Sequence, residues 1–458
     1  MNEYTDTRDP ASFRDPAGTV FYKNGDIYRQ INKPYKKQFD MLVSTGLYES
    51  LRRDSLLVQH EIIDMSLPDE AYKIIKPNQI PYISYPYEWC FGQLKDAALT
   101  TLKIHRRALD VGMILKDASA YNIQFIRGNP LLIDTLSFDI YEDGSPWVAY
   151  GQFCRHFLAP LYLMVYTDIR LSQLLKCYID GIPLDLAKNL LRLRGGAGAL
   201  QHIKWHANAT KKNASSNGKS LRQIKISKFS HIAMIDSLIR TIEKIKIKSL
   251  NTEWGDYYRC TNYSEKATED KKATVSQYLD HIKPASIWDF GANDGTYSRL
   301  ALKNNSHVIA FDMDPKAVEY NYANTKTSKE NMLPLILELT NPSPSIGFAN
   351  KERRTIDSRQ HPDCILALAL IHHLAISNNL PLEIISAWFS QLSSYLIIEF
   401  IPKNDTQVQK LLSTRDDIFD KYTIQDFEAT FAKFYDIIDK HEINETCRTL
   451  YLMKLNHC

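Results

Sequence analysis

Two aspartates and two glycines in the second half of the 458-residue chain have the types and spacing of a ligand-binding turn. Asp289 lies near the end of an apolar run, and Gly291 and Gly295 directly follow this run and precede a run with helical spacing. Glycines in such a strand-to-helix turn let the backbone approach a ligand and present helix N-terminal amides to it. Asp312 ends the next apolar run, where a carboxylate can accept hydrogen bonds from both hydroxyl groups of a ribose. Together these features predict a nucleoside ligand.

The spacing of the glycines indicates which nucleoside. A dinucleotide-binding turn has the pattern G-x-G-x-x-G, which lets a pyrophosphate sit on the end of the helix. Here the pattern is D-x-G-x-x-x-G, with Asn293 between the glycines, and an anionic Asp289 would repel a pyrophosphate and attract a cation. S-adenosylmethionine carries an ammonium and a sulfonium group and no phosphate, so it is the cofactor that the turn favours. The alternative is a purely structural turn in another α/β protein.

The elements around the turn predict a doubly wound parallel sheet. Short apolar runs, each typical of a strand buried on both faces, alternate with spans long enough for crossover helices. These runs are residues 286–290, 307–311, 334–337, 364–370 and 395–400. Two further runs, 434–438 and 448–455, are near enough to pair as an antiparallel hairpin.

From about residue 270 to 458 the sequence resembles the class I S-adenosylmethionine-dependent methyltransferases. The resemblance implies a Rossmann-like sheet of seven strands that ends in a reversed hairpin. Asn293 departs from the family pattern, because many members have glycine there. The cofactor contacts that the resemblance implies come from Asp289, Gly291, Asn293 and Gly295 around the methionyl part, Asp312 at the ribose and Glu338 beside the adenine.

Candidate catalytic residues are His372 and His373, which follow the run 364–370 at the carboxyl end of its expected strand. An imidazole suits a general base near neutral pH. Methyl transfer is an in-line displacement in which positioning and exclusion of water supply much of the effect, and a base is needed only if the acceptor must lose a proton. Either histidine could instead cap the strand or pack the loop, and Glu399 has the same two interpretations.

Aromatic and basic side chains ahead of the first strand of this half also have two interpretations. They could form a lid over the cofactor or pack an interface between the two halves of the chain. The residues concerned are Trp254, Tyr257, Tyr258, Tyr263 and Lys271.

The first half contains a second set of polar residues whose spacing is typical of a catalytic site. Asn122 follows Asp117 by five residues, and Asp134 follows Asn122 by twelve. Oxygen ligands at this spacing could hold a phosphate donor with Mg²⁺, with Asp117 facing the acceptor hydroxyl. About residues 15–205 resemble a divergent kinase-like domain, such as those of aminoglycoside and choline kinases. The resemblance implies an α+β fold, a catalytic Asp117, metal-binding Asn122 and Asp134, and Arg29 in place of the ATP-binding lysine.

The departures from the kinase pattern are material. Leu115 replaces the usual histidine, Thr135 and Leu136 follow Asp134 in place of Phe-Gly, and no G-x-G-x-x-G loop is present. A degenerate domain, or one that binds a different ligand, is therefore favoured over an active kinase. Asp117 and Asn122 could also be turn residues. The run 115–164, joined to a C-terminal methyltransferase, is similar to a bacterial group described as nodulation-protein-like methyltransferases.

Composition restricts the partners. Fifty-six Lys and Arg against 53 Asp and Glu leave a net charge of +3, and neither half has the basic, aromatic surface of a nucleic-acid reader. Seven widely spaced cysteines fit reduced thiols. The N-terminus is unlike a signal peptide, and no run reaches the roughly 18 apolar residues of a membrane span. We therefore expect a cytoplasmic protein without stable membrane insertion.

The sequence predicts a kinase-like domain at 1–205, a basic linker with a helix at 206–250, and a class I methyltransferase domain at 251–458. We expect an enzyme that methylates a small molecule or a sugar- or lipid-linked precursor. The N-terminal domain would bind substrate or nucleotide. Two alternatives stay open: a bifunctional kinase and methyltransferase that also binds ATP and Mg²⁺, and a ligand-sensing scaffold without turnover.

Overall fold

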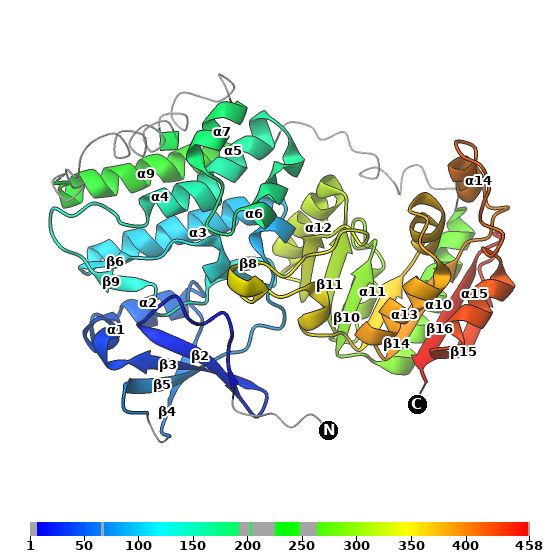
Figure 1. Ribbon diagram of the computed structural model, residues 1–458, viewed down its shortest axis with the longest axis horizontal. Coiled ribbons are helices and arrows are strands. Elements are labelled where there is room, and N and C mark those ends of the chain that lie inside the picture. Colours follow the sequence, from blue (N-terminus) through cyan, green and yellow to red (C-terminus); the bar gives the residue numbers. More distant parts are fainter. Residues whose placement is uncertain (1–6, 66–67, 192–201, 204–224, 248–262, 457–458) are drawn as a thin grey trace. The chain divides into compact units, whose positions relative to one another are not determined.

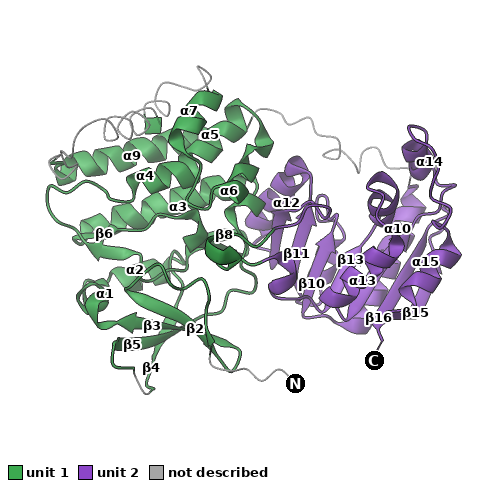
Figure 2. Ribbon diagram, viewed as in Figure 1, with its two compact units in different colours: residues 1–249, 344–354 green, residues 250–343, 355–458 purple. Residues whose placement is uncertain are grey.

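The computed structural model describes residues 7–65, 68–191, 202–203, 225–247 and 263–456, and Figure 1 shows their elements. The chain forms two compact units, shown in Figure 2: unit 1 comprises 1–249 and 344–354, and unit 2 comprises 250–343 and 355–458. Residues 344–354 lie inside the predicted methyltransferase domain, so their place in unit 1 is not predicted by the sequence. No helix in the described ranges is both long and apolar enough to cross a membrane.

Unit 1 begins with an antiparallel sheet of five strands in the order β1-β2-β3-β5-β4. The hairpin of β2 and β3 turns at Asn24 and Gly25, whose φ values of 51° and 83° suit a two-residue Asn-Gly turn. The strands are β1 Thr7–Arg8, β2 Gly18–Lys23, β3 Asp26–Asn32, β4 His60–Ile63 and β5 Ala71–Pro77. Two helices follow this hairpin, α1 Lys36–Ser44 and α2 Leu47–Arg53, and they separate at Gly46, where φ is 74°.

The rest of unit 1 is mainly helical. It contains the long helix α3 Phe91–Asp110 and a second hairpin, formed by β7 Ile123–Ile126 and β8 Asn129–Leu132. The remaining elements are β6 Met113–Leu115, which pairs with β9 Phe138–Ile140, and α4 Tyr150–Phe153, α5 Ala159–Tyr166, α6 Leu174–Cys177, α7 Leu184–Leu191 and α9 Lys228–Lys244. Helix α9 falls in the predicted linker but packs against α3, so it is part of unit 1. Residues 206–224 and 248–250 of that linker lie outside the described ranges.

Unit 2 is built on a seven-stranded sheet in the order β12-β11-β10-β13-β14-β16-β15. The pairs from β12 to β14 are parallel, whereas β16 is antiparallel to both β14 and β15, as the predicted reversed hairpin requires. The strands are β10 Ser286–Phe290, β11 His307–Asp312, β12 Met332–Ile336, β13 Cys364–Ala367, β14 Tyr395–Phe400, β15 Tyr435–Glu442 and β16 Thr449–Leu455. Strand β13 ends before the predicted residue 370 because Ala369 leaves the extended region, at a φ of 49°.

Helices cover both faces of this sheet because its strands are apolar on both sides. Ile287 packs in one cluster with Ala267 and Val275 of α10, whereas Phe290 stacks on Trp388 and Phe389 of α13. The helices are α10 Glu265–Ile282, α11 Ser298–Leu302, α12 Pro315–Ser328, α13 Leu382–Leu392, α14 Thr406–Leu412 and α15 Ile424–Phe431. The alternation of strands and helices therefore produces the doubly wound layers that the sequence predicts.

Candidate functional site

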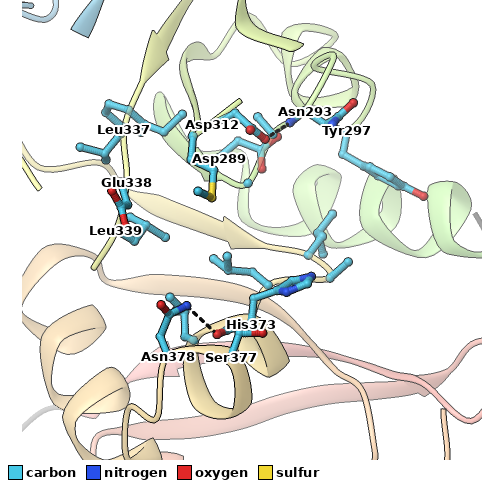
Figure 3. A pocket seen from close by; sticks show the side chains of 18 of the residues that line it. Asp289, Asn293, Tyr297, Asp312, Leu337, Glu338, Leu339, His373, Ser377 and Asn378 are labelled. Carbon is cyan, nitrogen blue, oxygen red and sulfur yellow. Dashed lines mark hydrogen bonds between the residues drawn. The ribbon is translucent and has the colours of Figure 1, made fainter. Parts of the chain in front are cut away.

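A cavity of about 360 Å³ lies at the carboxyl end of the sheet in unit 2. Much of its lining comes from residues at or just after the carboxyl ends of β10, β11, β12 and β13. These four ends lie at one edge of the sheet because the strands are parallel. In Figure 3, Asp289, Asn293 and Asp312 lie together, and His373 lies on another side of the cavity. Five of the six predicted cofactor residues line it: Asp289, Gly291, Asn293, Asp312 and Glu338.

Gly295, the sixth, is not among the lining residues. Its φ is 80°, and a Cβ at this position would come within 2.6 Å of Asn321 Oδ1. Packing against α12 therefore explains this glycine, whereas Gly291, with a φ of 76°, shapes the turn at the cavity itself. The backbone N–H of Gly291 donates to Phe311 O at 2.9 Å, which fixes the turn against β11.

Asp312 ends β11 with its carboxylate held by backbone amides. The N–H of Asn293 donates to one oxygen at 2.7 Å and the N–H of Asp314 to the other at 2.8 Å. Burial nevertheless raises the pKa of Asp312 to about 6. Each oxygen keeps a second lone pair, so the fixed carboxylate can accept hydrogen bonds from two adjacent hydroxyl groups.

Asp289 is the more deeply buried carboxylate, only 2% exposed. Ser298 Oγ donates to it at 2.6 Å, but burial, with a further contribution from Asp312, raises the pKa of Asp289 to about 7. A positively charged ligand would favour the ionised form of both carboxylates. The electrostatics of this wall therefore suit a cation.

A buried ion pair builds another part of the wall. Glu399, at the end of β14 and fully buried, accepts hydrogen bonds from Lys271 Nζ at 2.7 Å and from Ala369 N at 2.7 Å, and also from the Tyr263 hydroxyl. Burial raises the pKa of Glu399, but Lys271 and Arg448 outweigh this effect and the pKa is lowered. Glu399 is not among the lining residues, whereas Tyr263, Lys271 and Ala369 are.

The two adjacent histidines differ in position. His373 lines the cavity, and burial lowers its pKa to about 4, so the imidazole is neutral at neutral pH. His372 is not among the lining residues and is 3% exposed, and burial lowers its pKa well below the usual value. Only His373 is therefore placed to face a ligand.

Some lining residues were not predicted as site residues from the sequence. The sequence leaves two interpretations for Tyr263 and Lys271, a lid over the cofactor or an interface between the two halves of the chain. The structure places both residues at the cavity. Leu411 of α14 also lines the cavity, but the local sequence does not indicate this, because leucine is common on short helices. Trp254, Tyr257 and Tyr258 lie outside the described ranges.

Unit 1 brings its predicted residues together. Arg29 Nη1 lies 2.5 Å from Asp134 Oδ1, and Ser137 Oγ donates to Asp134 Oδ2 at 2.8 Å. Asn122 Nδ2 donates to Ser137 Oγ at 3.3 Å. Asp117 accepts from Gln152 Nε2 at 2.8 Å, and burial, followed by the nearby Asp134, raises the pKa of Asp117.

The predicted metal ligand Asp134 is already held by neighbouring groups of unit 1. Both oxygens of Asp134 are engaged, by Arg29, Ser137 and the backbone N–H of Leu136 at 2.9 Å. The described part of the chain contains no group of three or more His, Cys, Asp or Glu side chains that could hold a metal ion. The guanidinium of Arg29 compensates the charge of Asp134.

The sheet order and the position of the cavity give unit 2 a methyltransferase-like α/β fold. The chain belongs to the family of nodulation protein NoeA from Rhizobium meliloti (strain 1021): the two are 34% identical over 452 residues, 96% of this chain and 94% of that protein. No family model matches the chain.

Among solved structures, the chain is similar to N-methyltransferase NodS from Bradyrhizobium japonicum WM9, with 6% identity, a TM-score of 0.31, and coverage of 42% of this chain and 99% of that one. It is also similar to magnesium protoporphyrin IX methyltransferase (ChlM) from Synechocystis PCC 6803 with bound SAH, with 16% identity, a TM-score of 0.31, and coverage of 46% of this chain and 90% of that one.

Proposed function

We propose that unit 2 is an S-adenosylmethionine-dependent methyltransferase that acts on a small molecule or on a sugar- or lipid-linked precursor. The observation that supports this most is the convergence of Asp289 and Asp312 on one cavity. One buried carboxylate there favours a cation, and the other is fixed to accept from vicinal hydroxyl groups. A volume of about 360 Å³ is within the range of small-molecule sites.

Each residue then has a role in binding. Asp312 holds the ribose hydroxyl groups, Glu338 flanks the adenine, and Asp289 compensates the positive end of the cofactor. When bound, S-adenosylmethionine supplies an electrophilic methyl group. Gly291, which has no side chain, lets the backbone of the turn approach the ligand closely.

The acceptor side of the cavity supports catalysis by positioning and exclusion of water. Leu368, Leu370 and Leu374 make it apolar beside His373. With a pKa of about 4, His373 is a weak base, so we assign it to orienting the acceptor through a hydrogen bond. A neutral acceptor fits this wall best. The name of the 34%-identical relative supports a role in nodulation.

We further propose that unit 1 is a kinase-like domain that binds substrate or nucleotide without transferring phosphate. The Arg29–Asp134 ion pair supports this reading, because it neutralises the carboxylate that a phosphotransferase uses for its metal. The bifunctional alternative predicts Mg²⁺-dependent ATP binding that disappears in Asp134→Ala. Absence of ATP binding at millimolar nucleotide would exclude it.

Isothermal titration of the full chain with S-adenosylhomocysteine tests the methyltransferase proposal. We expect binding to the wild type, a loss of at least about tenfold in affinity in Asp312→Ala, and no change in the exposed control Asp420→Ala. Binding of NAD without S-adenosylhomocysteine would refute the proposal. A scaffold would keep its biological output in Asp312→Ala, whereas an enzyme would lose it. Mass spectrometry of co-purified small molecules would identify the acceptor.

A further inference from the structure

Residues 344–354 lie between β12 and β13 of unit 2 in the chain. They nevertheless belong to unit 1, in whose colour Figure 2 draws them. We call this segment the strap. It closes on itself: Ile346 and Arg353 form an antiparallel bridge, and the carboxylate of Glu352 accepts the N–H of Phe348 at 2.7 Å. Gly347 has a φ of 89°, and a Cβ there would lie 2.5 Å from Glu352 Cβ. The strap is therefore an ordered turn built around Glu352.

The strap is anchored to unit 1 by charged groups. Glu352, only 5% exposed, accepts from Arg14 Nε at 2.7 Å and from Arg14 Nη2 at 2.6 Å. Arg354 Nη2 donates to Asp9 Oδ2 at 2.9 Å, and the Arg354 backbone N–H donates to the Tyr85 hydroxyl at 2.8 Å. A bidentate pair with one partner buried is a strong and directional contact. The anchoring therefore differs from that of an exposed loop.

The anchors lie beside the candidate ligand residues of unit 1. The guanidinium of Arg353 sits 4.0 Å from the ring centroid of Tyr121, which directly precedes Asn122. Arg14 belongs to the segment between β1 and β2, and β2 pairs with β3, the strand that carries Arg29. A displacement of the strap would therefore release the contact on Tyr121, next to Asn122, and the ion pair of Arg14 in the segment that leads into β2.

The other end of the strap leads to the cavity of unit 2. Leu337, Glu338, Leu339 and Thr340 line that cavity directly after β12. Only residues 341–343 separate Thr340 from the strap. A ligand that fixes residues 337–340 thus restricts the start of the strap through a very short piece of backbone.

We infer that the strap couples the cavity of unit 2 to the ligand site of unit 1. Cavity occupancy favours the docked strap, and the docked strap orders Tyr121 and Arg14. Because binding free energies are linked, a ligand in unit 1 that prefers the docked strap strengthens binding in unit 2 by the same factor. The coupling rests on the proposed function for the identity of the cavity ligand and for ligand binding by unit 1.

Hydrogen–deuterium exchange on the full chain without ligand is the first test. In Glu352→Gln we expect exchange that is roughly tenfold faster in the strap, and also faster exchange at 118–123 and at 337–340. Arg14→Gln removes the same pair from its other side and should give the same pattern. The control Asp54→Asn breaks a different ion pair of unit 1, with Arg107, and should leave all three segments unchanged. Faster exchange confined to the strap would overturn the inference.

Addition of S-adenosylhomocysteine is the second test. We expect slower exchange at 337–340, in the strap and at 118–123 in the wild type, and only at 337–340 in Glu352→Gln. Protection confined to 337–340 in the wild type would also overturn the coupling. If S-adenosylhomocysteine does not bind, the proposed function fails, while the ligand-free comparison still decides the coupling.

Discussion

Replacing Asp289 by Asn should make the empty protein more stable and the cofactor bind less tightly. The buried Asp289 carboxyl has its pKa raised from 3.8 to about 7. Between these two pH values the folded state holds a proton that the unfolded state has lost. The free energy of unfolding therefore falls as the pH rises through this range. The stability that the protonated Asp289 carboxyl contributes is fully present below pH 3.8 and is lost once the pH passes about 7.

The size of this loss of stability follows from the difference between the two pKa values of Asp289. Each pH unit is worth about 1.4 kcal/mol, so an interval of about three units corresponds to roughly 4 kcal/mol. Asn keeps the shape and can still accept from Ser298, but a neutral acceptor weakens that hydrogen bond by about 1 kcal/mol. We therefore expect Asp289→Asn to stabilise unit 2 by about 3 kcal/mol at pH 8 and to have little effect at pH 4. For a unit of this size, that is a rise of roughly 6 to 12 °C in melting temperature.

Differential scanning calorimetry at pH 4, 6 and 8 measures the melting temperatures of the wild type and of Asp289→Asn. The exposed Asp420→Asn is the control. Titration with S-adenosylmethionine should show affinity that increases from pH 5 to 8 in the wild type, because the cation binds the ionised carboxylate. The same titration should be flat over this range in Asp289→Asn, apart from the smaller contribution of Asp312. Equal stability of variant and wild type at pH 8 would refute the reasoning, since it would mean that Asp289 pays no desolvation penalty.

Three further predictions concern packing, the buried ion pair and unit 1. Gly295→Ala should destabilise unit 2 by roughly 2 to 4 kcal/mol in thermal melts, because φ is 80° and the new Cβ meets Asn321, and an unchanged melt would contradict this. Glu399→Gln should cost about 3 kcal/mol because Lys271 loses its buried partner, whereas adding Lys271→Met should restore much of that stability. Additive costs in this double-mutant cycle would contradict the pairing. ATP binding to unit 1, measured by titration, should be unchanged when EDTA replaces Mg²⁺, and loss of binding in EDTA would favour a metal site.

The elements of unit 2 could be predicted because their signals are local. Its strands are short apolar runs, and the reversed hairpin follows two such runs close in sequence. Asp289 and Asp312 could be predicted to meet because Asp289 lies one residue before the end of β10 and Asp312 ends β11, and these two strands are parallel neighbours whose carboxyl ends coincide. Periodicity and turn chemistry fix these features within a few residues of each position.

The sequence alone thus determined the sheet, the turn and the acidic pair of this protein. Only the tertiary structure decided that His373 and not His372 faces the cavity, that Lys271 pairs with Glu399 across 128 residues of sequence, and that Glu352 of the strap pairs with Arg14 across 338. The physical reason is that a strand or turn is favoured by its own residues. A buried ion pair, in contrast, forms only when the whole fold has brought two charges together and excluded water from both.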